Sequence, residues 1–144
     1  MRWFYNPKTF WRNVEETLYW VKYCWQRAFR GWADCDSWSI ASYLVEILPP
    51  MLKRFKENNH GYPGWGQAST SEKWDTIIDN IIKGFEAGKR IEEDEYFQAT
   101  NADILTREPT REEVLSWIKA SKVDQKIFND NMKLFAKWFF HLWD

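Results

Sequence analysis

Basic and aromatic side chains gather between residues 27 and 60, and their types and spacing could hold a ligand. Arg27 and Arg30 lie three residues apart, just before Gly31-Trp32. Arginine can donate two parallel hydrogen bonds to a phosphate or carboxylate, and tryptophan offers a face on which a planar ring can stack. We therefore predict that this segment binds an anionic, ring-bearing small molecule such as a nucleotide. The predicted ligand-binding residues are Arg27, Arg30, Trp32, Trp38, Lys53, Lys56, His60 and Tyr62.

Structural alternatives stay open for the same residues. Lysine and arginine near a helix C-terminus offset the negative end of the helix dipole, and the sequence is as consistent with that role as with binding. His60 could donate to a phosphate or act as an acid or base, because imidazole changes charge near neutral pH. A single histidine in a loop is usually just exposed, so we expect no catalytic role for His60 and keep its binding role open.

Asp34-Cys35-Asp36 is a D-x-D motif, in which paired carboxylates could hold Mg²⁺ or Mn²⁺. The spacing alone supports a metal site only weakly, because the same two acids at a helix start would cap free N–H groups and offset the helix dipole. We favour the capping role and expect no metal ion, with Asp34 and Asp36 as weak candidates for metal ligands.

Signatures of common enzymes are absent from the sequence. It contains no P-loop, no G-x-G-x-x-G, no H-E-x-x-H and no G-x-S-x-G. All-helical nucleotide pyrophosphohydrolases use E-x-x-E and E-x-x-D sets on facing helices, which the acids here, such as Glu15-Glu16 and Glu92-Glu93, do not reproduce. We therefore expect no enzyme activity, no catalytic residue and no cofactor.

The composition indicates a single helical domain spanning residues 1–144. Hydrophobic residues make up 44% and charged residues 28%, so the chain can bury a core without disulfides or a metal. Tryptophan is unusually frequent, with 11 residues beside 10 Phe and 6 Tyr. Either some of this aromatic surface lines a pocket or a subunit contact, or the core simply uses large side chains, and the sequence favours the two interpretations equally.

The net charge of −1 provides no global field for nucleic acid, so we expect no sequence-specific nucleic-acid partner. The charge is uneven, because residues 1–60 carry 9 Lys/Arg against 6 Asp/Glu, whereas residues 61–144 carry 11 against 15. Cys24 and Cys35 lack zinc-ligand spacing, and we expect free thiols in a reducing cytoplasm. No signal peptide or membrane-spanning run is visible, so we expect no membrane partner.

Apolar spacing predicts four helices and no strand. The first covers residues 10–29 and ends at Gly31, because glycine tolerates a left-handed C-cap. The second begins near Asp34 or Asp36 and ends near residue 58, with a kink or a break at Pro49-Pro50. The apolar stripe of the first helix is Val14, Leu18, Val21, Trp25 and Ala28, widened by Trp11, Trp20 and Tyr23, and that of the second is Trp38, Ala41, Leu44, Val45, Leu48, Met51, Leu52 and Phe55.

Two further helices follow a glycine-rich loop. Ser69 and Glu72 form a capping box that opens the third helix, and Thr110 and Glu113 form one that opens the last. Residues 92–109 between them are predicted as a mobile loop or as a frayed extension of the third helix. Two apolar stripes on the last helix indicate a helical bundle that also forms a homo-oligomer. The stripe of the third helix is Trp74, Ile77, Ile78, Ile81, Ile82 and Phe85, and those of the last are Phe128, Met132, Phe135, Phe139 and Leu142, with Leu134 and Trp138 beside them.

Three segments of the chain together resemble a family of small, uncharacterised helical proteins encoded by tailed bacteriophages. The order and spacing of the segments match over most of the chain between Arg27 and Asp144. The resemblance implies a helical protein made in the cytoplasm of the infected bacterial host, and it supplies neither an established activity nor a set of binding residues. The segments are Arg30-Gly31-Trp32-Ala33-Asp34-Cys35-Asp36-Ser37-Trp38, then Pro50-x-Leu52-x-x-Phe55-Lys56 with His60-Gly61-Tyr62-Pro63-Gly64 and Trp74, and finally Leu134-Phe135-Ala136-Lys137-Trp138-Phe139-Phe140-His141-Leu142-Trp143-Asp144.

These observations lead to three hypotheses of function. The first is a phage-encoded, non-enzymatic binding protein that sequesters a nucleotide-derived immune signal and so counters anti-phage defence. The second is a structural or host-protein-binding phage factor that acts through its Trp-rich faces. The third is a metal-dependent enzyme that acts on a phosphate compound through Asp34 and Asp36.

Overall fold

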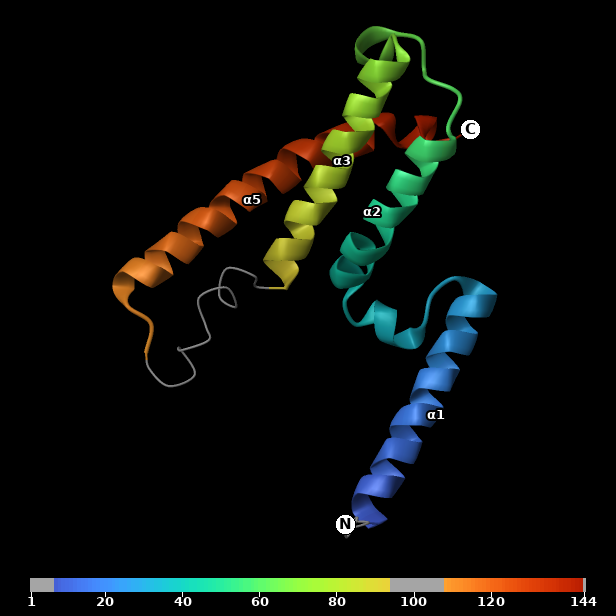
Figure 1. The fold of residues 1–144 in the computed structure, drawn as a ribbon, viewed down its shortest axis with the longest axis vertical. Coiled ribbons are helices and arrows are strands. Elements are labelled where there is room, and N and C mark those ends of the chain that lie inside the picture. Colours follow the sequence, from blue (N-terminus) through green and yellow to red (C-terminus); the bar gives the residue numbers. More distant parts are fainter. Residues whose placement is uncertain (1–6, 94–107, 144) are drawn as a thin grey trace, which may run out of the picture. The chain divides into compact units, whose positions relative to one another are not determined.

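The computed structural model describes residues 7–93 and 108–143, with side chains from residue 15 onward. Within these ranges the chain is α-helical, with short 3-10 helices and no strand, so the all-α class and the four predicted helices are confirmed (Figure 1). None of the described helices is long and apolar enough to cross a membrane. The α-helices are α1 (Pro7–Arg30), α2 (Ile40–Asn58), α3 (Ser71–Glu92) and α5 (Arg111–Trp138), and the 3-10 helices are η1 (Asp34–Ser37), η2 (Gly66–Ala68) and η4 (Phe139–His141).

Backbone contacts divide the chain into two compact units. Unit 1 comprises Met1–Ile40 and includes α1 and η1. Unit 2 comprises Ala41–Asp144 and includes the rest of α2 together with α3 and α5. The segment with the D-x-D motif therefore belongs to unit 1, and the loop with His60 belongs to unit 2.

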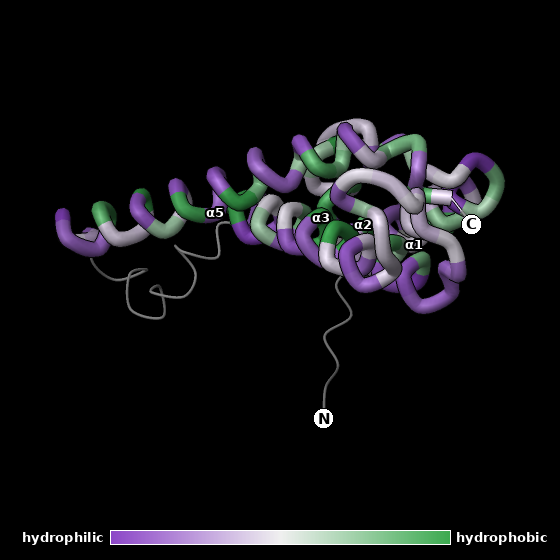
Figure 2. Tube along the Cα trace, turned by 90° about the horizontal axis from the view of Figure 1, so that it is seen from above, coloured by the Kyte–Doolittle hydropathy of each residue, from purple (hydrophilic) through white to green (hydrophobic). Residues whose placement is uncertain are grey.

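α3 is the central helix of unit 2, and the apolar stripe predicted for it is buried. Ile78 and Ile81 have no exposed surface, and burial of an aliphatic side chain of this size contributes about 1.5–3 kcal/mol. α2 adds Val45 and Leu52 to the same core, and α5 adds Trp138. Hydrophilic and hydrophobic residues alternate along α5 in Figure 2, as expected for an amphipathic helix.

Glycines of α3 allow α5 to approach closely. A Cβ added at Gly84 would lie 2.6 Å from Cβ of Asn131, and one added at Gly88 would lie 2.8 Å from Cδ2 of Phe128. Both distances are shorter than real Cβ contacts, so these positions require glycine. The sequence does not reveal this contact, because a glycine inside a helical pattern indicates only a lower helix propensity.

Ion pairs flank the core of unit 2. Arg90 of α3 donates hydrogen bonds of 2.8 and 2.7 Å to the carboxylate of Asp124 on α5. Asp124 is 7% exposed, and it is the one buried charged residue in the described part of the chain. Salt bridges also link the antiparallel helices α2 and α3, where partial exposure limits their contribution to stability. These pairs are Lys89–Glu46, Lys53–Glu86 and Lys56–Asp79.

The second helix begins later than the sequence predicts. Asp34 and Asp36 lie in η1, and α2 begins at Ile40. The prediction was wrong because both carboxylates bind side chains of the preceding helix, a competition that local spacing does not reveal. α2 runs through Pro49-Pro50 without interruption, so the predicted break is not found, and the kink stays a prediction.

One of the two predicted capping boxes is found, and the other is replaced by a single N-cap hydrogen bond one residue later. Thr110 and Glu113 form the predicted box, in which the two backbone N–H groups donate to the opposite side chains at 2.7 and 3.3 Å. At the start of α3 the N-cap is Thr70 instead of Ser69, and its hydroxyl accepts a hydrogen bond of 3.4 Å from the N–H of Lys73. Of the predicted loop over residues 92–109, positions 94–107 lie outside the described residues.

Candidate binding site

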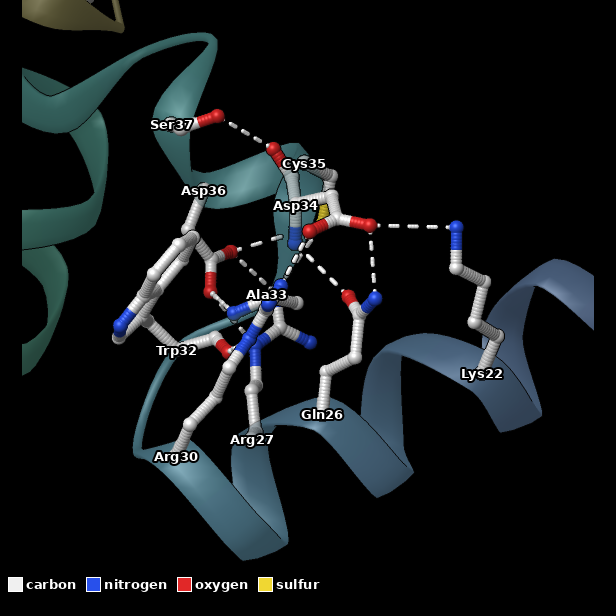
Figure 3. Close-up of polar contacts among 10 residues, drawn as sticks. All are labelled: Lys22, Gln26, Arg27, Arg30, Trp32, Ala33, Asp34, Cys35, Asp36 and Ser37. Carbon is white, nitrogen blue, oxygen red and sulfur yellow. Dashed lines mark hydrogen bonds and ion pairs between the residues drawn. The ribbon is translucent and has the colours of Figure 1, made fainter.

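Unit 1 consists of a helix and a loop that folds back beside its last turns (Figure 3). α1 ends at Arg30, one residue past the predicted end, and Gly31 follows it as predicted. Gly31 has the left-handed φ of +78° and donates its N–H to the carbonyl of Arg27 at 3.0 Å. A residue with a Cβ atom adopts this conformation only at a cost, which explains the glycine. The reversed chain places η1 within reach of the polar side chains at the end of α1.

Asp34 is the centre of one polar cluster in this loop. Its carboxylate accepts a hydrogen bond of 2.7 Å from Nε2 of Gln26, lies 3.2 Å from Nζ of Lys22 and forms an ion pair with Arg30. Its backbone N–H donates to Oε1 of Gln26 at 2.8 Å. The hydrogen bonds from Gln26, Arg30 and Lys22 hold the pKa of Asp34 well below its usual range, so its carboxylate is charged at neutral pH.

Asp36 is the centre of a second polar cluster, and its side chain is only 8% exposed. The carboxylate accepts hydrogen bonds from Nη2 of Arg27 and, at 3.1 Å, from Nε of Arg27. It also accepts the backbone N–H of Ala33 at 2.7 Å, which caps the first turn of η1. The contact with Arg27 lowers the pKa of Asp36 and raises the pKa of Arg27.

The carboxylates of the D-x-D motif therefore face cations of their own unit. Within the described ranges, no group of three or more His, Cys, Asp or Glu side chains is placed to hold a metal ion. The same contacts occupy both arginines. Arg30 in addition donates from Nε to the carbonyl of Trp32 at 3.1 Å, and its Cζ lies 4.0 Å from the centroid of the Trp32 ring. A phosphate would therefore compete with a carboxylate of the same unit for either arginine.

An open groove of about 750 Å³ lies in unit 1, and we call it the aromatic groove. Tyr19 and Tyr23 are one helical turn apart on α1, and their ring centroids are 6.2 Å apart. Trp20 on α1 and Trp38 after η1 are 66% and 80% exposed. A neutral or cationic ligand suits the groove better than an anion, because its lining holds one lysine and two carboxylates. The full set of lining residues is Glu16, Tyr19, Trp20, Lys22, Tyr23, Asp34 and Trp38.

Trp38 was predicted as a ligand-binding residue, but the aromatic residues of α1 in this groove were not. Trp20 and Tyr23 were assigned to the apolar stripe of the helix. Successive residues of an α-helix are rotated by about 100°, which places both side chains on the side away from Leu18 and Trp25. Helical spacing could therefore have found them, because positions 16, 19, 20 and 23 share one face.

Lys53, Lys56 and His60, three further predicted ligand-binding residues, lie in unit 2. Nζ of Lys53 lies 2.7 Å from Oε1 of Glu86, and Nζ of Lys56 lies 2.8 Å from both carboxylate oxygens of Asp79. Both ammonium groups thus have a carboxylate partner from α3. His60 is exposed in the loop that follows α2.

Tyr62, the remaining predicted residue, lines a small cavity of about 90 Å³ in unit 2. The cavity brings together the H-G-Y-P-G loop and residues close to the C-terminus. Its other lining residues are Gly61, Pro63, His141 and Trp143.

An aromatic cluster in unit 2 also includes His141. The ring of Trp138 packs edge-on against Trp74 and against His141, with centroid distances of 5.6 and 5.4 Å. Nε1 of both tryptophans and Nδ1 of His141 are buried without a hydrogen-bond partner among the described residues.

The eight predicted residues divide equally between the two units. In unit 1, Arg27, Arg30 and Trp32 are brought together with two carboxylates, and Trp38 lines the aromatic groove. No family model, no curated protein and no solved structure matches this chain. The resemblance to tailed-phage proteins therefore stays a prediction, and the function has to be inferred from the site itself.

Proposed function

We propose that this chain is a non-enzymatic binding protein whose aromatic groove binds a partner protein. The groove itself is the observation that carries the proposal, because four aromatic side chains line one open space and none of them is part of the buried core. Tyrosine and tryptophan dominate the energetics of protein interfaces, since each combines a large apolar area with one polar atom and few rotatable bonds.

The charges in unit 1 also support a protein partner. Glu16 and Asp34 outnumber Lys22 in the lining, so a basic side chain of a partner would find a complementary charge. The arginines near the groove are bound to Asp34 and Asp36. The lining of the groove thus offers aromatic surface and two carboxylates beside one lysine, which favours a peptide or protein surface over a phosphate compound.

The resemblance to tailed-phage proteins supports a cellular setting for this binding. A phage protein of this family would be made in the cytoplasm of the infected bacterium. The partner would then be a protein of the bacterial host, and binding would redirect or block that protein during infection.

Two tryptophans of similar exposure provide the test. Trp38 lines the groove and is 80% exposed, whereas Trp143 lies in unit 2 and is 70% exposed. The tagged chain is expressed in the bacterial host, and co-purifying proteins are quantified by isotope-labelled mass spectrometry. We expect a host protein that wild type and Trp143→Ala retain, and that Trp38→Ala loses by at least about tenfold.

Binding is then measured with the purified host protein by calorimetry, and the three affinities should follow the same order. Circular dichroism and urea unfolding must show that both variants keep the fold. Equal retention of the host protein by the two variants would show that the aromatic groove is not the binding surface.

Sequestration of a nucleotide-derived immune signal is the second candidate function. It is favoured by the stacking faces of Tyr19, Tyr23 and Trp38, because stacking of a base on an aromatic ring contributes about 1–3 kcal/mol. Lys22 would supply the cation for a phosphate, in competition with Asp34 at 3.2 Å.

Native mass spectrometry separates the two candidates. The protein is purified from a phage-challenged, defence-active bacterial lysate and then denatured, and the released small molecules are identified. Release of a nucleotide-derived compound that Lys22→Ala no longer retains would make sequestration the better account. A protein that releases none, and whose Lys22→Ala variant still binds the host protein, would support the protein partner.

A further inference from the structure

α1 carries a second surface, on the side away from the aromatic groove. Leu18, Val21 and Trp25 repeat at intervals of three and four residues, and they are 64%, 52% and 66% exposed. Ala28 continues the repeat, and Phe29 flanks it with its ring centroid 4.3 Å from that of Trp25. We call these five residues the α1 stripe. A stripe with this repeat is typical of a helix that pairs with another helix.

We infer that the α1 stripe is covered by helix α1 of a second copy of this chain, with the two helices antiparallel. A two-fold symmetric contact brings the same surface from both copies together, so that surface must be complementary to itself. α1 meets this condition in charge, in side-chain size and in apolar area.

The charges of α1 are complementary in the antiparallel arrangement. Glu15 and Lys22 lie seven residues apart and therefore on the same flank of the stripe. An antiparallel pair brings the same flank of both helices together. In one register Glu15 of each copy then lies opposite Lys22 of the other copy, so that the ion pair forms twice. Lys22 also contacts Asp34, but its ammonium group has three donors and its side chain is 53% exposed. In a parallel pair, the flank with Glu15 and Lys22 would instead lie opposite the other flank of the second copy, which carries the uncharged Thr17 and Cys24.

The sizes of the apolar side chains favour the same arrangement. The register set by Glu15 and Lys22 places Leu18 opposite Val21 of the second copy, a larger side chain against a smaller one. A parallel pair would place every residue of the stripe opposite itself. Trp25 would then crowd against Trp25, and Ala28 would face Ala28 across a void, and both faults destabilise a closely packed interface.

The apolar area of the stripe is sufficient for a dimer. An aromatic side chain buries about 150–250 Å², so Trp25 and Phe29, at roughly two-thirds exposure, would together bury about 200–300 Å² per copy. With Leu18 and Val21 included, the two copies bury an area on the order of 1,000 Å², which is the lower limit for a stable interface.

The dimer and the proposed function use different faces of α1. Lys22 is the one residue common to both, and Trp38 contributes nothing to the stripe. Capture of a host protein can therefore fail while the dimer forms, and the dimer can be absent while the groove binds its partner.

Sedimentation equilibrium of the full chain tests the dimer with two matched variants. Val21 in the stripe and Val123 on α5 are 52% and 55% exposed. We expect wild type and Val123→Lys to dimerise equally, and Val21→Lys to dimerise at least about tenfold more weakly, with wild-type circular dichroism for both. A wild-type chain that stays monomeric at about 100 µM, or a Val21→Lys variant that dimerises normally, would overturn the inference.

Thiol cross-linking tests the orientation. In a Cys35→Ser background, Thr17→Cys would lie opposite the native Cys24 of the second copy, since both are on the flank without charges. A short bifunctional maleimide should then link two copies when both thiols are present. It should not link them when Cys24 alone is present, or when Thr17→Cys is combined with Cys24→Ser. Linkage through identical positions would indicate parallel helices and contradict the inference.

Discussion

The two units of this chain place polar and apolar side chains in opposite ways. In unit 2, apolar residues of α3 such as Ile78 are buried between α2 and α5, and most ion pairs lie at the surface. In unit 1, hydrogen bonds and ion pairs to Asp34 and Asp36 hold the loop on α1, while large apolar side chains such as Trp25 are exposed.

This difference indicates that the units have different tasks. A loop held by charged hydrogen bonds acquires a defined geometry without the use of its aromatic residues. Those residues remain available for other molecules, and contiguous exposed apolar surface is typical of interaction sites. Unit 2 contains the buried core, and we propose that unit 1 supplies the binding surfaces.

Replacement of one tryptophan in each unit should give the largest difference in the free energy of unfolding. Trp74 is 1% exposed in unit 2, and Trp25 is 66% exposed in unit 1. Trp74→Ala should lower the free energy of unfolding by about 3–5 kcal/mol, because it leaves a large cavity in the core. Trp25→Ala should change it by less than about 0.5 kcal/mol at concentrations where the chain is monomeric. Urea unfolding followed by circular dichroism measures both, and similar losses would remove the contrast between the units.

Substitutions that disturb the close packing of α3 on α5 should have the next largest effect on the free energy of unfolding. Gly84→Ala would place a Cβ 2.6 Å from Cβ of Asn131, so we expect a loss of about 1–3 kcal/mol in unfolding free energy. Gly61→Ala is the matched control, because the nearest atom to its Cβ, Oδ1 of Asn59, would lie at an ordinary 3.7 Å. A Gly84→Ala variant as stable as Gly61→Ala would mean that the two helices do not approach this closely.

Acid should break the hydrogen bonds and ion pairs of Asp34 and Asp36 in unit 1. Among the predicted changes, this one should affect the stability of the whole molecule least. The pKa values of Asp34 and Asp36 are lower in the folded state than in the unfolded state. The two carboxylates therefore contribute their full stabilisation above the unfolded-state pKa of about 3.9. This stabilisation is lost as the pH falls below that value and through the folded-state pKa values. The indole N–H signal of Trp32 in an NMR titration should therefore stay constant from neutral pH to about 4.5 and shift below about pH 4.

Asp34→Asn and Asp36→Asn together should produce the same shift of the Trp32 signal at neutral pH. The indole signal of Trp74 in unit 2 should stay in place in this double variant, because its surroundings contain neither carboxylate. A Trp74 signal that moves with that of Trp32 would show that the carboxylates also determine the structure of unit 2.

The fold of unit 2 was predictable from local patterns. The stripe from Trp74 to Phe85 repeats with the helical period, and Thr110 and Glu113 satisfy N–H groups within one turn. Contacts between distant residues were not predictable in the same way. Gly84 has no side chain to signal that another helix packs against it, and Asp34 is bound by side chains of a helix that precedes it.

The candidate site was predictable only in part. The residue types in the segment that contains Arg27, Arg30 and Trp38 pointed to a charged and aromatic region in unit 1. The sequence did not show that the arginines bind carboxylates of the same segment, because an arginine binds a phosphate and a carboxylate with the same geometry. Trp20 and Tyr23 were missed because they were assigned to the apolar face of the helix, and Tyr19 was not singled out in the sequence.

Photo-cross-linking at one position of each surface tests the central claim most directly. Benzoylphenylalanine replaces Tyr23 in the aromatic groove, Trp25 in the α1 stripe or Lys133 on α5 of unit 2, whose side chain is 78% exposed. The three variants are irradiated in living host cells, and the products are identified by mass spectrometry. If unit 1 supplies the binding surfaces, position 23 captures a host protein, position 25 captures a second copy of the chain, and position 133 captures neither. Capture at position 133 equal to that at positions 23 and 25, or no capture at positions 23 and 25, would contradict the claim that unit 1 supplies the binding surfaces.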